Sequence, residues 1–551
     1  MRHSSPLLRA LTALVLVSTV ASSQAAPAGQ SQRLRSHDDL VRFFTEWRQF
    51  QRPKLVDGVP DYTAPAMTAQ YRALTSMKRR LAAFDTTGWS VAQQVDYQVV
   101  RAEMNGLDFD HRVLKPWANN PAYYVTVFSD QSDQPAREGP FAYGSIELWS
   151  YAYPLSASDA ATIEAGMRAI PPLLAQARTN LVGDQRDIWH YGIGAIRDQS
   201  GELARFAERL TSEPASLRAS VAAARAATDS LVTWLEARAS RKTGASGIGI
   251  ANYDWYLKHV MLVPYSWADE VLLMQRELAR SHSFLALEEL RNARLPKQDP
   301  IATAGDFDRR FGASIAEYLD YLREHDLYTV KPWMDQALRE RLGRFSSGPL
   351  EFFHQVDYRD PVVMRTHGYH WFDLGFMKHE PHANPIRRGP LLYNIFISRT
   401  EGHATGWEEQ MLQAGMFDAR PRSRELIYIL LAQRAARALG DLRMHANQAT
   451  LEQAAEFTVA NVPRGWLSIK GNLVRFEQHL YLQQPGYGTS YVIGKLMLDR
   501  LLMRRRQQLG ESFSMRQYMA AFDAVGLVPA SLVEWEMTGE LRDDVRKMLR
   551  P

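Results

Sequence analysis

The sequence predicts a mostly α-helical protein, built as one large multi-helix domain with a central cleft. Three observations predict this class: apolar residues recur at helical spacing, strand-like alternation is rare, and glycine and proline mark short turns without a long linker. The chain has 551 residues, of which 46% are hydrophobic and 23% charged, a globular composition that excludes a disordered or fibrous protein. We expect residues 26–551 to form this domain, either continuous or divided into two lobes around the cleft.

Residues 1–25 have the pattern of a secretory signal peptide. Arg2 and Arg9 precede an apolar run at 10–21, and small residues follow that run at 22–26. The run is shorter than the ~20 apolar residues that a membrane span needs, and no later charge-free run is long enough. The chain has no cysteine, so no lipid can be attached at the cleavage site. We expect a periplasmic or secreted protein without a stable membrane anchor.

The first predicted helix lies at residues 40–50, where apolar side chains form one helical stripe. Ser36 or Asp38 stands in the position of its N-terminal cap. Strand signals are few along the whole chain. The best of them is the short run YYVTVF at 123–128.

A second stripe lies at residues 315–322, where Ser314 and Glu317 have the spacing of a capping box. A third predicted helix, at 425–438, is apolar nearly all round at its start. Such a pattern is typical of a helix buried deep inside a larger bundle.

The absence of several sequence motifs excludes several classes of catalytic and binding site. Without cysteine there is no disulfide framework, thiolate metal site or cysteine nucleophile. The nucleophile elbow G-x-S-x-G, the Rossmann glycine motif and H-E-x-x-H are absent. The segment 488–495 resembles a P-loop, but it has one residue too many between its glycines, and Leu496 stands where Ser or Thr would bind magnesium. A net charge of only +4 predicts no nucleic-acid partner.

Histidines cluster in one part of the chain. Of the 15 histidines, six lie within residues 354–403, together with several aspartates and glutamates. Histidine and carboxylate without thiolate suit zinc or a similar divalent ion. The six are His354, His367, His370, His379, His382 and His403.

Spacing indicates which histidines act together. His367 and His370 are three residues apart, so on a helix they would share a face that Asp373 continues. His379 and His382 have the same spacing, but a proline separates them. That segment therefore predicts a helix end with solvated turn histidines.

Glu401 opens the second informative segment. On a helix Glu401 and Glu408 lie along one side, and Gly402 and Gly406 allow close approach of a neighbouring backbone. A buried carboxylate is costly unless it is paired or binds a metal, which favours a site. The alternative is a surface helix with a glutamate-rich face.

Several blocks in fixed order resemble one bacterial family, the domain-of-unknown-function family 885. They include Glu401-Gly402-x-Ala404-x-x-x-Glu408, Asp441-x-x-x-His445, and Pro485-Gly486 with Tyr491 and Gly494-Lys495. The resemblance implies a helical, metallopeptidase-like fold.

The family's usual metal segment reads His-Glu-x-x-Pro-Gly-His-His, and His367 lies at the corresponding distance before Glu401. The resemblance therefore implies a divalent metal, expected to be zinc, on His367, His370 and Glu401. This chain departs from the motif, because Gly368 stands where the family has the glutamate that activates water.

Other residues of the chain are candidates for the remaining catalytic roles, and geometry must decide among the bases. Glu408, Asp373 or Glu380 would replace the missing general base. Tyr491 and His445 would stabilise the oxyanion that forms during amide hydrolysis.

Two functions follow. The first is an exported metal-dependent hydrolase that acts on peptide bonds. The second is a non-catalytic relative that binds a peptide or another ligand in the same cleft, as the lost glutamate suggests. A third hypothesis is a different hydrolase or lyase reaction in the same cleft. The metal-dependent hydrolase requires His367, His370 and Glu401 to converge on one point.

Overall fold

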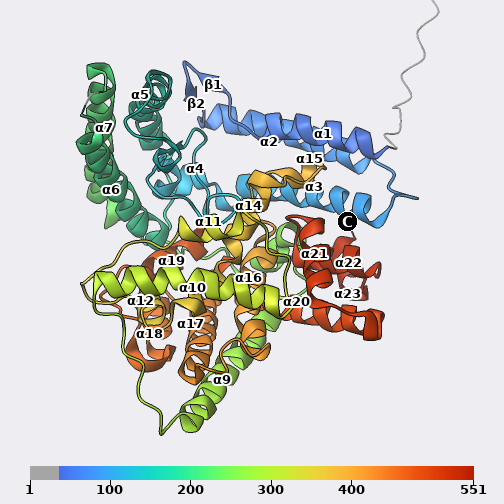
Figure 1. The fold of residues 1–551 in the computed structure, drawn as a ribbon. Helices are drawn as coiled ribbons and strands as arrows, with labels where there is room; N and C mark the ends of the chain where they lie inside the picture. Colours follow the sequence, from blue (N-terminus) through green and yellow to red (C-terminus); the bar gives the residue numbers. More distant parts are fainter. Residues whose placement is uncertain (1–35, 212, 551) are drawn as a thin grey trace, which may run out of the picture.

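The computed structural model describes residues 36–211 and 213–550, and the predicted signal peptide lies outside them. The described chain is mostly helical, which confirms the predicted class (Figure 1). Its strands form two small pairs. β1 (Leu55–Val56) is antiparallel to β2 (Val59–Pro60), and β3 (Val127–Phe128) is parallel to β4 (Ile146–Glu147).

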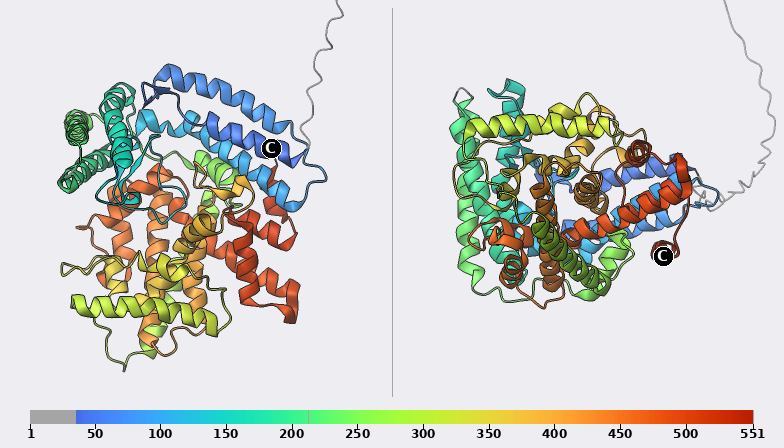
Figure 2. Two further views of the ribbon diagram at one scale, coloured as in Figure 1. Left: turned by 45° about the horizontal axis from the view of Figure 1, so that its top comes forward. Right: turned by 60° about the horizontal axis from the view of Figure 1, so that its bottom comes forward.

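The helices form three groups around the middle of the molecule (Figures 1 and 2). The blue N-terminal group lies along one side and comprises α1 (His37–Phe50), α2 (Ala64–Ala82) and α3 (Val91–Phe109). The green group beside it has its own apolar core and comprises α5 (Ala157–Asn180), α6 (Arg186–Arg209) and α7 (Ala215–Ala239).

The third group carries the largest apolar core, which it shares with the N-terminal helices. Its members include α9 (Trp267–Arg291), α10 (Ala304–Glu324), α13 (Pro361–His367), α14 (Tyr369–His379), α16 (Ile397–Gln413), α17 (Pro421–His445), α18 (Leu451–Asn461), α19 (Leu473–Gln483), α20 (Tyr487–Leu509), α21 (Met515–Val525), α22 (Ala530–Thr538) and α23 (Asp543–Leu549).

The first and third predicted helices are confirmed. Helix α1 begins after Ser36, whose side chain forms a capping box with Asp39. Helix α17 includes the predicted stretch 425–438, and nearly every residue of it is buried between α9, α18 and α20. The all-round apolar pattern therefore identified a central helix correctly.

The capping box at Ser314 is wrong, because α10 begins at Ala304 and is capped by Thr303. Ser314 lies in the interior of the helix, where its hydroxyl donates to the carbonyl of Phe311. A serine inside a helix commonly bonds back to the preceding turn in this way, so the spacing alone did not mark a helix start.

The predicted strand at 123–128 forms only at its end. Residues Pro121–Tyr124 form a 3-10 turn, because Pro121 fixes its own φ and Asn120 caps the amide of Ala122. Extended pairing begins at Val127.

Helices α16 and α20 pack against each other more extensively than any other pair. Glycines permit this contact: a Cβ on Gly402 would lie 2.4 Å from the Cα of Gly494, and a Cβ on Gly494 would lie 1.9 Å from the carbonyl oxygen of Ser398. Both obstacles are backbone atoms that cannot rotate away. The crossing therefore brings residues of α20 close to Glu401.

We expect Gly494→Ala to force these helices apart and destabilise the protein by about 1–3 kcal/mol or more, as overpacking does. Gly194→Ala is the matched control, because Gly194 also lies inside a helix but a Cβ there meets nothing within 4 Å. Thermal unfolding of both variants measures the difference. Equal melting temperatures would contradict the account of the crossing.

Within residues 36–211 and 213–550, no helix is both long enough and apolar enough to cross a bilayer.

Candidate functional site

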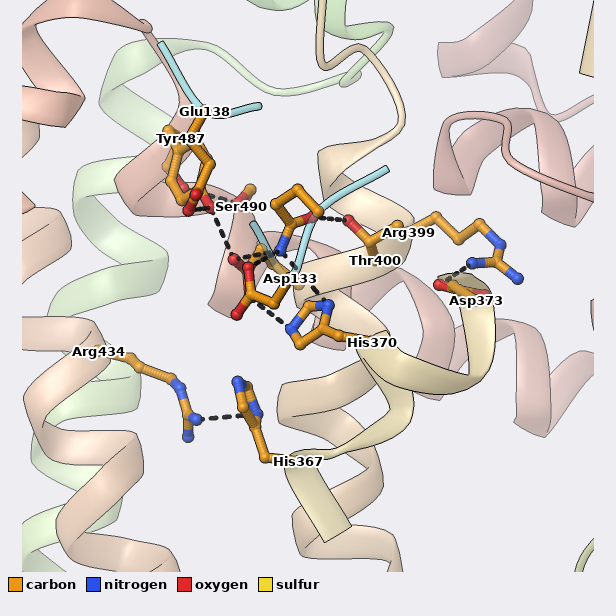
Figure 3. A network of polar contacts seen from close by, with 12 residues as sticks. Asp133, Glu138, His367, His370, Asp373, Arg399, Thr400, Arg434, Tyr487 and Ser490 are labelled. Atoms are coloured by element: carbon orange, nitrogen blue, oxygen red, sulfur yellow. Dashed lines mark hydrogen bonds and ion pairs between the residues drawn. The ribbon is translucent and has the colours of Figure 1, made fainter. Parts of the chain in front are cut away.

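The three predicted metal ligands converge. His367 ends α13 and His370 lies in the first turn of α14 (Figure 3), and Glu401 lies in the first turns of α16. One ligand atom from each lies within 4.8 Å of the other two, and in the described part of the chain no other such group occurs. The geometry expected of a metal site is therefore met, while metal binding itself stays a prediction.

The backbone arrangement that brings the two histidines together differs from the predicted single helix. His367 and His370 do not share a face of one helix, because α13 ends at His367 and α14 begins at Tyr369. Between the two helices the chain bends at Gly368, with φ −63° and ψ 8°. Asp373 does not continue the histidine face; its carboxylate pairs with Arg399 at 2.6 Å.

His370 and Glu401 face each other in the interior. Nε2 of His370 lies 3.2 Å from Oε2 of Glu401, and each residue is 2% exposed. The distance is that of an ion pair, but the angles form no hydrogen bond, so both atoms lack a hydrogen-bond partner. Two ligands at 2.0–2.2 Å from a tetrahedral zinc ion lie roughly 3.3 Å apart, so this separation suits coordination.

The two groups favour each other's charge. Burial alone would disfavour both charged forms, but their mutual attraction prevails. The pKa of His370 is raised to about 9, and the pKa of Glu401 is lowered to about 2. Without a metal the protonated imidazole and the carboxylate attract each other as opposite charges, and a cation between the two atoms would replace the proton of the imidazole.

The other oxygen of Glu401 is held by two donors. Oε1 accepts from Nε2 of Gln134 at 3.0 Å and from the hydroxyl of Tyr487 at 2.8 Å. Gln134 is itself fixed, because its carbonyl oxygen accepts from Thr400 at 2.8 Å. These contacts occupy Oε1 and leave Oε2 directed at His370.

The ion pair between Glu408 and Arg434 orients His367 through the Nδ1 side of its ring. Its Nδ1 lies 2.9 Å from Oε1 of Glu408, and Arg434 donates to both oxygens of that carboxylate at 2.6 and 2.8 Å. Burial would raise the pKa of Glu408, but Arg434 and His367 lower it below its usual value. A carboxylate on one ring nitrogen fixes a metal-binding histidine and leaves the other nitrogen, here Nε2, for the site.

The three predicted bases are all engaged elsewhere. Glu408 is 0% exposed and held by Arg434 behind His367. Asp373 is paired with Arg399. Glu380 lies at the exposed end of α14, where it accepts from Lys331 at 2.7 Å.

The two predicted oxyanion donors differ in their surroundings. Tyr491 lies one turn after Tyr487, with its ring centroid 4.2 Å from the Arg437 guanidinium, and its hydroxyl makes no hydrogen bond within the described residues. Burial and then Glu401 raise the pKa of Tyr491, so it stays a protonated donor. His445 instead donates from Nε2 to the carbonyl of Tyr481 at 3.0 Å and is 0% exposed. His445 therefore supports the backbone of α19.

Sequence reasoning missed the loop 129–145, which joins β3 to β4 and brings Gln134 against Glu401 and Glu138 against Tyr487. Oε1 of Glu138 lies 2.7 Å from the Tyr487 hydroxyl, whose single proton it shares with Glu401, and Oε2 of Glu138 accepts from Ser132 at 3.1 Å. Burial, and then the nearby Asp133, raise the pKa of Glu138 to about 7. One signal was available: a loop this long inside a compact domain is uncommon and often functional.

The opposite side of this loop lines a pocket of about 620 Å³. Ala136, Arg137 and Gly139 contribute to its wall, and aromatic side chains that include Tyr143 and Tyr256 surround it. Gln134, which contacts Glu401, is close in sequence to the loop residues that line the pocket, so the loop lies between the pocket and the group His367, His370 and Glu401.

Comparisons with known proteins agree with this picture of the fold. A predicted lipoprotein of unknown function from Shewanella oneidensis has a solved structure with a TM-score of 0.65 at 14% identity, covering 91% of this chain and 97% of that one. A predicted lipoprotein from Colwellia psychrerythraea gives a TM-score of 0.64 at 15% identity, covering 92% and 99%. At such identities the likeness shows the fold alone. No curated protein matches the chain.

One family model covers most of the chain. It is described as "Bacterial protein of unknown function (DUF885)" and matches residues 49–369 and 370–537, which include all three converging side chains. The boundary between the two matched parts falls between Tyr369 and His370, inside the segment that carries both histidines. The chain belongs to the DUF885 family.

Proposed function

We propose that this protein is an exported metal-dependent hydrolase that cleaves peptide bonds, with zinc held by His367, His370 and Glu401. The observation that carries the proposal is the pair of buried atoms, Nε2 of His370 and Oε2 of Glu401, which face each other without a hydrogen bond. Buried polar atoms normally have a partner, so two that lack one beside a second histidine support the proposal of a cation site.

The donor set suits the metal. Two imidazoles and one carboxylate are a common catalytic zinc set, which leaves a position for water or substrate. A bound divalent ion polarises the scissile carbonyl and lowers the pKa of the attacking water. His367 keeps 17% of its side chain exposed, so the cluster is open to solvent on that side.

The chain's own residues then have separate tasks. Glu408 and Arg434 fix His367, while Gln134 and Tyr487 fix Glu401. The free hydroxyl of Tyr491 would donate to the oxygen of the scissile carbonyl as negative charge develops there. The neighbouring 620 Å³ pocket is large enough to receive side chains of a peptide.

Export rests on two observations. Residues 1–25 have the pattern of a signal peptide. The two solved relatives are described as lipoproteins, a class that is exported, although this chain has no cysteine for a lipid.

A second function has one specific observation in its favour. Each of the three predicted bases, Glu408, Asp373 and Glu380, pairs with an arginine or lysine, so a peptide-binding protein without catalysis would also suit the fold.

The test uses residues 26–551, purified without a histidine tag or chelator. We expect about one zinc per chain by plasma mass spectrometry, and hydrolysis of an internally quenched peptide library that 1,10-phenanthroline abolishes. His367→Ala should lose both, whereas His379→Ala should keep both, because His379 lies at the exposed end of α14 against Trp333. Zinc without hydrolysis would favour the binding function, and no zinc would overturn the metal site.

A further inference from the structure

The pocket of about 620 Å³ beside loop 129–145 contains a buried carboxylate. Asp110 lines this pocket and is 8% exposed. Its Oδ2 accepts from the hydroxyl of Tyr393 at 2.8 Å, and within the described residues no other hydrogen bond and no ion pair reaches the carboxylate. A buried carboxylate is costly unless a cation pairs with it. Asp110 therefore lacks the partner that a buried charge normally has.

Two π-helical turns of the described chain border this pocket. Asp110 begins the turn Asp110–Leu114, which follows α3. Tyr256, another lining residue, directly precedes the turn Leu257–Met261. Such turns are rare and occur frequently at functional sites. The placement of both turns at one pocket favours a functional role for it over a packing defect.

Aromatic rings form much of the remaining wall. Burial, and then the charge of Asp110, raise the pKa of Tyr256, so the carboxylate and this ring are close neighbours. The faces of aromatic rings attract organic cations, and they also pack against apolar stems. The rings that line the pocket include Tyr62, Trp117, Tyr123, Phe141, Tyr256 and Tyr393.

The three arginines of the pocket wall do not offer a free buried cation. Arg48 pairs with Glu103 at 3.3 Å. Arg137 pairs with Glu147, the other carboxylate of the wall. Arg52 is exposed, so water and salt screen its charge. An anionic ligand would therefore meet no unpaired buried cation in this pocket, whereas a cationic ligand would meet an unpaired buried carboxylate.

We propose that this pocket binds an organic cation with an apolar stem, an amine or guanidinium of the kind that a lysine or arginine side chain carries. The cationic head pairs with Asp110, and the stem packs against the aromatic rings. Burial raises the pKa of Asp110 to about 7, and a cation beside the carboxylate would lower that pKa again. As far as the chain is described, the pocket wall includes none of the proposed zinc ligands, so this binding does not depend on zinc or on hydrolysis.

The test uses isothermal titration calorimetry with three compounds that share one stem: phenylbutylamine, phenylbutanol and phenylbutyrate. None contains a peptide bond, so a peptide hydrolase cannot consume them. Asp110→Asn keeps an acceptor for Tyr393 and removes the charge. Asp108→Asn is the matched control, because Asp108 lies two residues earlier but already pairs with Lys78 and Arg112.

We expect residues 26–551 to bind phenylbutylamine roughly 10–100-fold more tightly than phenylbutanol, because a buried hydrogen bond to a charged group is stronger than a neutral one. Phenylbutyrate should bind most weakly. Asp110→Asn should lower the affinity for the amine by the same factor and leave that for the alcohol unchanged. Asp108→Asn should bind all three compounds as the wild type does. The affinities should be the same with zinc and with a chelator.

Several outcomes would overturn the proposal. These are an amine that binds no more tightly than the alcohol, a preference for phenylbutyrate, no binding of any of the three compounds, and wild-type affinity for the amine in Asp110→Asn. An equal loss in Asp108→Asn would also overturn it, because the effect would then not belong to the pocket. A protein that binds the amine but no zinc would lose the proposed hydrolase function and keep this site.

Discussion

Replacing Glu401 with alanine is expected to abolish stoichiometric zinc binding. Glu401 supplies the one carboxylate of the cluster, and its Oε2 faces His370 at 3.2 Å. Loss of a residue that only orients a ligand typically lowers metal affinity 10–100-fold, so loss of the ligand itself should lower it further. Competition against a fluorescent zinc chelator measures the affinity.

The control for this variant is Glu380→Ala, which removes an exposed carboxylate that contacts Lys331 and Trp333. Its zinc affinity should match the wild type. Circular dichroism of Glu401→Ala must show the helical fold, and Glu401→Gln provides a variant of nearly the same shape. Wild-type zinc affinity in a folded Glu401→Ala protein would contradict the assignment.

Arg434→Met is expected to destabilise the protein by about 3–5 kcal/mol, the usual cost of leaving a buried charge without its partner. Arg434 is 1% exposed and Glu408 is 0% exposed, so no water can replace the two hydrogen bonds from the guanidinium. Urea unfolding measures the change in the free energy of unfolding. The variant should also lose zinc affinity, because Glu408 no longer fixes His367.

Arg443→Met is the matched control, since Arg443 lies on the same helix but is exposed and stacks over Phe457. Its effect should stay within about 0.5 kcal/mol. The double variant Glu408→Gln with Arg434→Met removes both charges, so it should cost less than the sum of the two single variants. Additive costs would show that the pair is not coupled.

The sequence predicted the helical class well because the signal was long and periodic. Helix α17 was recognisable because its start is apolar nearly all round, and almost every side chain from Leu426 to Leu442 packs inside the protein. Helix α1 was recognisable from its stripe and its cap at Ser36. The start of α10 was misplaced because Ser314 has a capping pattern in sequence while its hydroxyl bonds to its own helix.

The candidate site was predictable in its residue types and its spacing in the chain. His367, His370 and Glu401 were expected together, and the structure brings them together. The bend at Gly368 was not expected, because helical spacing alone assumes a continuous helix. Tertiary packing against Leu338 closes the space at that residue, and no local pattern encodes it.

The contribution of loop 129–145 could not be predicted from the sequence. Gln134 and Glu401 are 267 positions apart and meet through a hydrogen bond of 3.0 Å. Such a contact depends on how β3, β4 and α16 are placed relative to one another. Periodicity and motif spacing describe only neighbours in the chain, so polar residues of a distant loop carry no signal that assigns them to this site.

Diffraction from crystals soaked in zinc, recorded on both sides of the zinc absorption edge, tests the central claim most directly. The account predicts one strong anomalous peak bounded by Nε2 of His367, Nε2 of His370 and Oε2 of Glu401, at 2.0–2.2 Å from each. No peak at this position in a protein that retains the fold, or a peak held by other side chains, would contradict it.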